Sequence, residues 1–295
     1  GTAEDPEQAA HYYRMAAELG DADGQTSYAW CCRNGYGTEE NLEEAVKWYT
    51  LAAGQKHPRA LYNLALLYQS GNGVEEDKPH AAELMQASAE AGYPAALNLM
   101  ARYYENGIGV ETDQAKAAEW AEKGAKSGQR DAQCRLGWYY DTGYGVEQSD
   151  EKAFYWYKKS ADSGSAQGAY NLAWCYAHGQ GTAASERKCV RAFRRAAELG
   201  HAGAQYSLGW RYANGKGVKK DYALAAEWYR KAAQQNHSSA CNNLGIMYEN
   251  GQGVPADPTE AVRLFEQAIA CDPENGYACH SLGSCYEHGR GVEAD

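Results

Sequence analysis

The chain has 295 residues, a formal net charge of −11 and a hydrophobic content of 44%, which is ordinary for a globular protein. The negative charge argues against nucleic acid as the main partner, because binding phosphates requires a basic surface. No segment approaches the run of about 18 apolar residues that a membrane-spanning helix needs. The nine cysteines contain no C-x-x-C pair, which leaves zinc-ribbon and thioredoxin-like sites without support.

A Gly-x-Gly loop recurs along the sequence at a nearly constant interval. The loops begin at Gly35, Gly71, Gly107, Gly143, Gly179, Gly215, Gly251 and Gly289. The interval is 36 residues six times and then 38 residues. A fixed period between about 20 and 50 residues is typical of a solenoid or a related array, in which each unit contacts mainly its neighbours.

The residues before each loop predict a helix with one buried face. A small residue lies six positions before every loop, and Tyr lies three positions before seven of the eight loops. Together with a Leu or Met seven positions before most loops, these offsets fall on one side of a helix. The small position lets a second helix approach closely, so Gly137→Leu or Gly209→Leu is expected to overpack the core by about 1–3 kcal/mol.

A second helix is predicted after each loop. The sixth residue after the first loop glycine is always a good N-cap type, namely Asn41, Asp77, Asp113, Ser149, Ser185, Asp221, Asp257 and Asp295. Most second helices end at a glycine such as Gly92 or Gly128, which suits a left-handed C-terminal cap. Asn236 can take this role at one end without glycine, whereas Lys56 and Asp272 suit it less well.

In chain order, the pattern predicts about sixteen antiparallel helices in a single array over residues 1–295. A second-type helix begins after Asp5, with Pro6 at its first position, and completes a partial unit over residues 1–20. Units of 36 residues follow from about residue 21 to 272, and a lone first-type helix lies in a partial unit over residues 273–295. Because these ends lack the polar caps that solenoids normally need, either the array is part of a longer one or a partner covers its ends.

The complete pattern is visible in one repeat. Its residues are Ala204-Gln205-Tyr206-Ser207-Leu208-Gly209-Trp210-Arg211-Tyr212, then Gly215-Lys216-Gly217-Val218, then Asp221, Ala225, Trp228, Tyr229, Ala232 and Ala233. This pattern resembles the Sel1-like repeat family over nearly the entire chain. The tetratricopeptide repeat is the nearest alternative, but its period is about 34 residues. The resemblance implies an all-α fold, a right-handed α-α superhelical solenoid, and a role as a protein-interaction scaffold or adaptor.

A candidate binding surface lies on the first helices, opposite their buried stripe. Because a helix advances about 100° per residue, the residue five positions before each loop and the one a turn earlier point away from the core. The predicted partner-binding residues at these positions are Trp30, Tyr62, Arg102, Trp138, Tyr170, Trp174, Tyr206 and Trp210. If the first helices line the inner surface of the solenoid, their rings form the floor of a groove. The alternative is that the tryptophans fill gaps between repeats.

The expected partner is a protein or a peptide, because exposed Trp and Tyr in a concave surface are typical binding anchors. Four acidic residues lie near the same face, namely Glu105, Asp141, Glu249 and Glu287. Arg102 and Arg211 are nearby cations. Such a groove would suit a cationic or amphipathic peptide, and the alternative is that the acidic residues only form a solvated face. A glycan that stacks on the ring faces is the alternative ligand. A peptide complex should weaken with salt, whereas a glycan complex should show little salt dependence.

The sequence argues against an enzyme. Ser149-x-x-Lys152 and Ser185-x-x-Lys188 match a serine–lysine motif, but both serines occupy predicted helix caps and the companion motifs are missing. The eight histidines show no metal-binding spacing. The glycine loops connect two helices and lack the Lys-Ser/Thr of a phosphate-binding loop. We therefore expect no catalytic residue, no metal and no cofactor.

The resemblance also implies a disulfide bond between Cys271 and Cys279, which are eight residues apart and span the turn between two units. Secreted cysteine-rich members of the family carry pairs at this spacing, although the other units of this chain lack one. The remaining cysteines fit as small core residues. A bridge would favour a secreted or periplasmic location. The start Gly1-Thr2-Ala3 lacks the features of a signal peptide, but removal of one stays open, and so do the compartment and the oligomeric state.

Overall fold

The structure, a computed structural model, describes residues 4–292 and consists over that range of sixteen α-helices without a strand. The helices are α1 (Pro6–Glu18), α2 (Ala22–Asn34), α3 (Leu42–Gly54), α4 (Pro58–Ser70), α5 (Lys78–Glu90), α6 (Pro94–Asn106), α7 (Gln114–Lys126), α8 (Arg130–Thr142), α9 (Asp150–Asp162), α10 (Ala166–His178), α11 (Glu186–Glu198), α12 (Ala202–Asn214), α13 (Tyr222–Ala233), α14 (Ser238–Asn250), α15 (Pro258–Cys271) and α16 (Gly276–His288). Even-numbered helices precede a Gly-x-Gly loop and are called A helices, and odd-numbered helices are called B helices. The predicted all-helical fold is confirmed.

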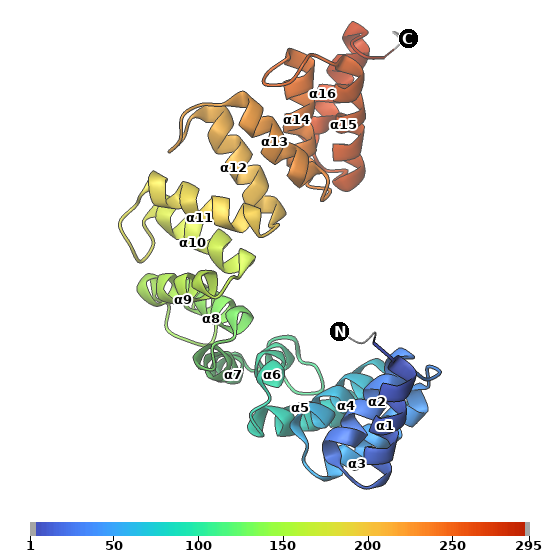
Figure 1. Cartoon of the computed structure of the whole chain (residues 1–295). Coiled ribbons are helices and arrows are strands. Elements are labelled where there is room, and N and C mark those ends of the chain that lie inside the picture. The colour runs from blue at the N-terminus through green and yellow to red at the C-terminus, as the bar shows by residue number, and fades with distance from the viewer. Residues whose placement is uncertain (1–3, 293–295) are drawn as a thin grey trace. The chain divides into compact units, whose positions relative to one another are not determined.

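The chain forms two compact units, Gly1–Gln148 and Ser149–Asp295. Unit 1 contains α1 to α8, and unit 2 contains α9 to α16. Within each unit, every helix packs against its neighbours in the chain, as expected for stacked two-helix repeats (Figure 1). None of the helices in the described range combines the length and the hydrophobicity that crossing a lipid bilayer requires.

Side-chain caps begin the B helices where the repeat predicts them. Asn41 accepts a hydrogen bond from the backbone N–H of Glu44 at 2.9 Å, and Asp221 accepts one from Leu224 at 3.0 Å. The same bond is made by Asp5, Asp77, Asp113, Ser149, Ser185 and Asp257. Each such cap satisfies a backbone donor that has no partner inside the helix. The predictions for these caps are confirmed, whereas Asp295 lies outside the described residues.

Left-handed residues end most of the helices. Each A helix ends at the first glycine of its loop, where φ lies between 61° and 76°. Lys56 and Asn236 adopt the same conformation after their B helices, with φ of 59° and 60°, although neither is glycine. Asp272 is extended instead, with φ of −150°. From the start of α15 to the start of α16 the chain is two residues longer than in the other repeats, because α15 has 14 residues and its connection has four.

The second glycine of each loop allows consecutive repeats to stack. A Cβ atom on Gly37 would collide with the carbonyl group of Pro6 at the start of α1, and one on Gly109 would collide with that of Lys78 at the start of α5. Each loop therefore rests directly on the first turn of the preceding B helix. Any side chain at this position would push the two repeats apart.

The core lies between the A and B helices. A Cβ atom on Gly209 of α12 would come within 2.8 Å of the Tyr229 ring in α13, and one on Gly245 of α14 would come within 2.6 Å of the Phe265 ring in α15. Both rings are buried. The small residue six positions before the loop therefore makes room for an aromatic ring of the following B helix, and the predicted close approach is confirmed.

Candidate functional site

The A helices hold their predicted tryptophans away from the core. Trp30, Trp138, Trp174 and Trp210 are each 36–39% exposed, so none of the four indoles is sealed inside the repeats. Arg102 is also exposed. The other predicted residues are half-buried, namely Tyr62, Tyr170 and Tyr206.

Four of the eight predicted residues come together in unit 2. Tyr170 and Trp174 of α10 and Tyr206 and Trp210 of α12 line one cleft of about 490 Å³, called the aromatic cleft below. The rest of the lining is Ala177, His178, Phe193, Gly203, Ser207, Arg211, Lys216 and His237. The equivalent faces of two consecutive A helices thus share a single cavity.

Contacts between rings hold the α10 side of the aromatic cleft in place. Trp174 meets the Phe193 ring of α11 edge to face, with centroids 5.7 Å apart, and stacks on His178 at 5.2 Å. Tyr170 packs edge-on against both Trp174 at 6.1 Å and Phe193 at 5.7 Å. Such contacts add to the stabilisation from buried area, so this wall is ordered before any ligand arrives.

A histidine that begins the next helix supports Tyr170 from the other side. His201 stacks on Tyr170, and its Nδ1 accepts a hydrogen bond from the backbone N–H of Ala204 at 3.1 Å. Because Nδ1 accepts, the ring proton lies on Nε2, which donates to the side-chain oxygen of Gln167 at 3.0 Å. Burial lowers the pKa of His201, and that of the equivalent His237, below the ordinary value. Burial therefore favours the neutral form of both imidazoles.

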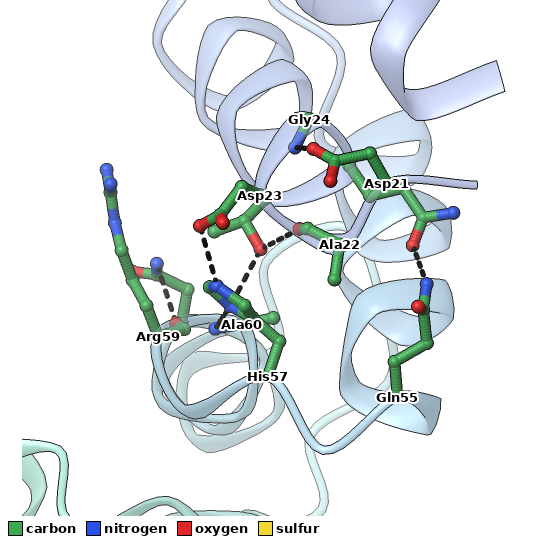
Figure 2. A network of polar contacts seen from close by, with 11 residues as sticks. Asp21, Ala22, Asp23, Gly24, Gln55, His57, Arg59 and Ala60 are labelled. Atoms are coloured by element: carbon green, nitrogen blue, oxygen red, sulfur yellow. Dashed lines mark hydrogen bonds and ion pairs between the residues drawn. The ribbon is translucent and has the colours of Figure 1, made fainter. Parts of the chain in front are cut away.

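The same arrangement recurs in the next repeat, and a histidine cap without the stacked tyrosine occurs in unit 1. His237 stacks on Tyr206 at 4.8 Å and begins α14. Figure 2 shows His57 in unit 1, where Nδ1 accepts from the N–H of Ala60 and Nε2 lies 3.0 Å from a carboxylate oxygen of Asp23. These histidines are not among the residues predicted from the repeat pattern. Their signal was available, because each lies fourteen residues before a loop glycine.

Charged groups line the other end of the aromatic cleft. Arg211 forms an ion pair with Glu186 of α11, and its guanidinium lies 5.2 Å from the centre of the Phe193 ring. Lys216 lies 3.4 Å from the other oxygen of Glu186 and 5.8 Å from the centre of the Trp210 ring. Burial alone would raise the pKa of Glu186, but the hydrogen bond and charge of Arg211, together with Lys216, outweigh burial and lower it. Because Arg211 and Lys216 share the single carboxylate of Glu186, this end of the aromatic cleft has a net positive charge.

The structure corrects two expectations about charge. Arg211 is only 4% exposed, because it lies four positions before its loop, on the buried side of α12, and it lines the aromatic cleft as the partner of Glu186 rather than as an exposed cation. Glu105 pairs with Arg135, and Glu249 pairs with Arg290 at 2.8 Å. Two of the four acidic residues near this face are thus paired within the chain, which weakens the expectation of a cationic partner.

In unit 1, the predicted residues pack against local aromatic rings. The ring centroids of Trp30 and Tyr36 are 5.3 Å apart, and Tyr36 lies in the loop that follows the helix of Trp30. Trp138 likewise lies 5.5 Å from Tyr144. Tyr62 of α4 lies 5.0 Å from Tyr93, the residue that precedes α6. These contacts hold the rings on their helices, but the strongest convergence of predicted residues is in unit 2.

The serine motifs and the cysteines were the other candidates for a functional site in the sequence. Ser149 and Ser185 accept the backbone N–H groups of Lys152 and Lys188, as helix caps do. No group of His, Cys, Asp and Glu within residues 4–292 is arranged to hold a metal ion. Cys271 and Cys279 are exposed and carry free thiols in this structure. The disulfide bond between them stays a prediction, which masses measured with and without reductant can test.

Comparisons with known proteins agree with the repeat and the fold. The Sel1 repeat model matches residues 1–21, 22–57, 58–93, 94–129, 130–165, 166–201, 202–237, 238–273 and 276–295. A protective antigen of uropathogenic Escherichia coli strains that displays an SLR fold is 31% identical, with a TM-score of 0.79; the match covers 100% of this chain and 70% of that one. A Sel1 repeat protein from Oxalobacter formigenes is 32% identical, with a TM-score of 0.80, over 96% of this chain and 82% of that one. No curated protein sequence matches the chain significantly.

The family model covers nearly the whole sequence, and both crystal structures share the stacked helix pairs. Solenoids of this kind commonly mediate protein interactions and are generally not enzymes. The chain belongs to the Sel1 repeat family.

Proposed function

We propose that the protein is a non-enzymatic scaffold that binds a segment of a protein partner in the aromatic cleft of unit 2. One observation carries this proposal: Tyr170, Trp174, Tyr206 and Trp210, chosen from the repeat pattern alone, line the same cavity. Partly exposed indoles beside a cavity are typical anchors for a partner's side chains. The cleft volume of about 490 Å³ falls within the usual range for ligand sites.

The electrostatics of the cleft indicate what kind of segment it binds. The aromatic wall suits an apolar side chain, and the positive end around Lys216 suits a neighbouring carboxylate. We therefore propose a peptide with an apolar residue next to an acidic one, whereas the sequence led us to expect a cationic or amphipathic peptide. Because Lys216 is exposed to solvent, binding should weaken as salt increases.

A glycan ligand is the alternative, but the rings offer it less surface. Stacking on a sugar requires a free ring face. His178 already stacks on one face of Trp174, with planes 10° apart, and the Lys216 ammonium lies over the ring of Trp210. These contacts favour the peptide over the glycan.

Substituting leucine for the two tryptophans tests the proposal. Other repeats carry Leu66 and Ile246 at the same position, so Trp174→Leu/Trp210→Leu should fold. Peptides selected from a random display library on the wild-type protein serve as probes, with affinities measured by titration calorimetry. We expect the double variant to bind them at least about 30-fold more weakly, the effect of losing a hot-spot residue worth about 2 kcal/mol.

Trp30→Leu is the matched control, because Trp30 has the same repeat position and similar exposure but lies in unit 1. It should leave the affinity unchanged. Equal affinities of the wild type and the double variant for every selected peptide would refute the aromatic cleft as the binding site.

A further inference from the structure

Unit 2 contains a strongly basic segment, although the chain as a whole has a negative net charge. Residues 185–220 contain nine Lys or Arg and only two Glu, whereas the rest of the chain contains 19 Lys or Arg and 37 Asp or Glu. The segment spans α11, α12 and most of the loop that follows α12. A local charge of this size and sign raises the concentration of anionic partners nearby.

The basic side chains surround a second cavity. A cleft of about 530 Å³, called the basic cleft below, is lined by Ser185, Arg187, Lys188, Val190, Arg191, Arg194, Gly217 and Val218. No acidic residue is part of this lining. Arg187, Lys188, Arg191 and Arg194 are all exposed, so their charged groups are available to a ligand.

The fold builds the walls of the basic cleft. Arg187, Arg191 and Arg194 are spaced by four and three residues along α11, which places them in one stripe on the helix surface. Gly217, with φ of 76°, brings the loop so close that a Cβ atom there would lie 3.0 Å from Val190 and from the Glu186 carbonyl oxygen. The loop therefore forms a second wall beside the basic stripe.

Two tyrosines of the A helices position the cations. Arg194 donates a hydrogen bond to the hydroxyl of Tyr212 at 2.6 Å. The ammonium of Lys188 lies 5.5 Å from the centre of the Tyr176 ring. Both tyrosines lie three positions before a loop glycine, the place where Tyr recurs through the array. A recurring structural residue thus holds the side chains of this unusual helix.

Other B helices show that the fold does not require these charges. The position of Arg191 is acidic in three of them, as Glu83, Glu119 and Glu227. The position of Arg194 is acidic in two, as Glu122 and Glu266. The same helix position thus accepts a positive or a negative side chain without a change of fold. The basic stripe on α11 is therefore better explained by ligand binding than by a role in stabilising the fold.

We propose that the basic cleft docks an acidic, carboxylate-rich segment of a protein partner. Arginine forks bind carboxylates with two parallel hydrogen bonds. Arg187 and Arg191 are about 6 Å apart along the helix axis, at about 1.5 Å per residue. Alternate side chains of an extended peptide are about 6.6 Å apart, so carboxylates two residues apart can reach both arginines. A long polyanion such as nucleic acid fits less well, because the acidic remainder of the chain would repel it.

A fluorescein-labelled peptide of alternating glutamate and serine tests this proposal by fluorescence anisotropy. We expect the full chain to bind it, with an affinity that falls as salt is added, and not to bind a peptide with glutamine in place of glutamate. Arg187→Gln/Arg191→Gln should weaken binding about tenfold. Arg14→Gln/Arg59→Gln changes the net charge equally at exposed positions of unit 1 and should leave the affinity unchanged.

Three results would overturn the inference. The first is no binding of the acidic peptide, and the second is equal weakening by both double variants, which would indicate only a general charge effect. The third is tighter binding of single-stranded DNA or phosphatidylserine vesicles, lost in Arg187→Gln/Arg191→Gln, because the cleft would then serve another class of partner. Trp174→Leu/Trp210→Leu should not affect binding of the acidic peptide, which separates this inference from the aromatic cleft.

Discussion

Tyr170 of α10 and His201, the N-cap of α12, stack face to face, with ring centroids 4.3 Å apart and planes 17° apart. The same imidazole accepts the N–H of Ala204 and so begins α12. One residue thus caps a helix and supports a wall of the aromatic cleft. The capping role requires a neutral ring with a free Nδ1 lone pair, which links the start of α12 to pH.

The caps at His201 and His237 predict a loss of stability in mild acid. Above the ordinary pKa of about 6.5 both the folded and the unfolded chain hold neutral imidazoles, and the caps contribute fully. As the pH falls, the unfolded chain binds protons first, because burial lowers the pKa of both groups in the folded state. The free energy of unfolding should therefore fall from about pH 6.5 downwards, until the folded-state groups are also protonated.

Asparagine replacements isolate this effect. Asn caps a helix as well as the best residues do and does not titrate, so His201→Asn/His237→Asn should lose stability less steeply between about pH 7 and pH 5. Urea unfolding followed by circular dichroism at each pH gives the comparison. If the wild type and the variant had the same slope, other groups would be responsible for the acid sensitivity.

Overpacking Gly209 should destabilise unit 2. The Tyr229 ring occupies the space that a larger residue would need, so Gly209→Leu should lower the free energy of unfolding by about 1–3 kcal/mol. Gly283 has the same repeat position in α16 but no atom within 4 Å of its Cβ site. Gly283→Leu should therefore be neutral, or stabilising by up to about 1 kcal/mol through helix propensity. Thermal unfolding of both variants tests the assignment, and equal shifts would contradict it.

The ion pair between Arg211 and Glu186 predicts an asymmetry between its partners. Arg211 is buried, whereas Glu186 is half-exposed and also contacts Lys216. Glu186→Gln leaves a buried cation without its carboxylate and should cost about 1–3 kcal/mol. Arg211→Met leaves only a solvated carboxylate and places an apolar side chain where another repeat has Met247. It should cost less, as measured by urea midpoints at equal slopes; the reverse order would show that the guanidinium is not desolvated.

Two tyrosines at the same position of different B helices predict opposite effects of removing a hydroxyl. The hydroxyl of Tyr229 accepts a hydrogen bond from Asn243 at 3.2 Å. The Tyr49 hydroxyl is buried without a partner among residues 4–292. Tyr229→Phe should therefore destabilise the protein by about 1 kcal/mol, and Tyr49→Phe should be neutral or stabilising. Equal losses in thermal unfolding would show that Tyr49 finds a partner in solution.

Local rules in the sequence were sufficient to predict the helices. The loop period, the caps at Asn41 and Asp221, and the small residue at Gly209 each depend on contacts within one helix pair. Every repeat uses the same kinds of residue for its loop, its N-cap and its helix contact. One sequence pattern therefore predicts where the helices begin and end within the described range. The exposure of Trp174 and Trp210 follows in the same way from the angle that each helical residue turns through.

The composition of the candidate sites depends instead on contacts between repeats. The phase of the helix predicts that Trp174 points outward, but not that Phe193 supports it or that Tyr206 shares its cavity. Likewise, Arg211 looked like a surface cation until the structure showed it buried against Glu186. These partners lie 19 to 32 residues apart in the chain, and the distances between them depend on how adjacent helix pairs pack. Helical periodicity alone determined which side chains leave the core, and only packing between repeats decided which of them meet.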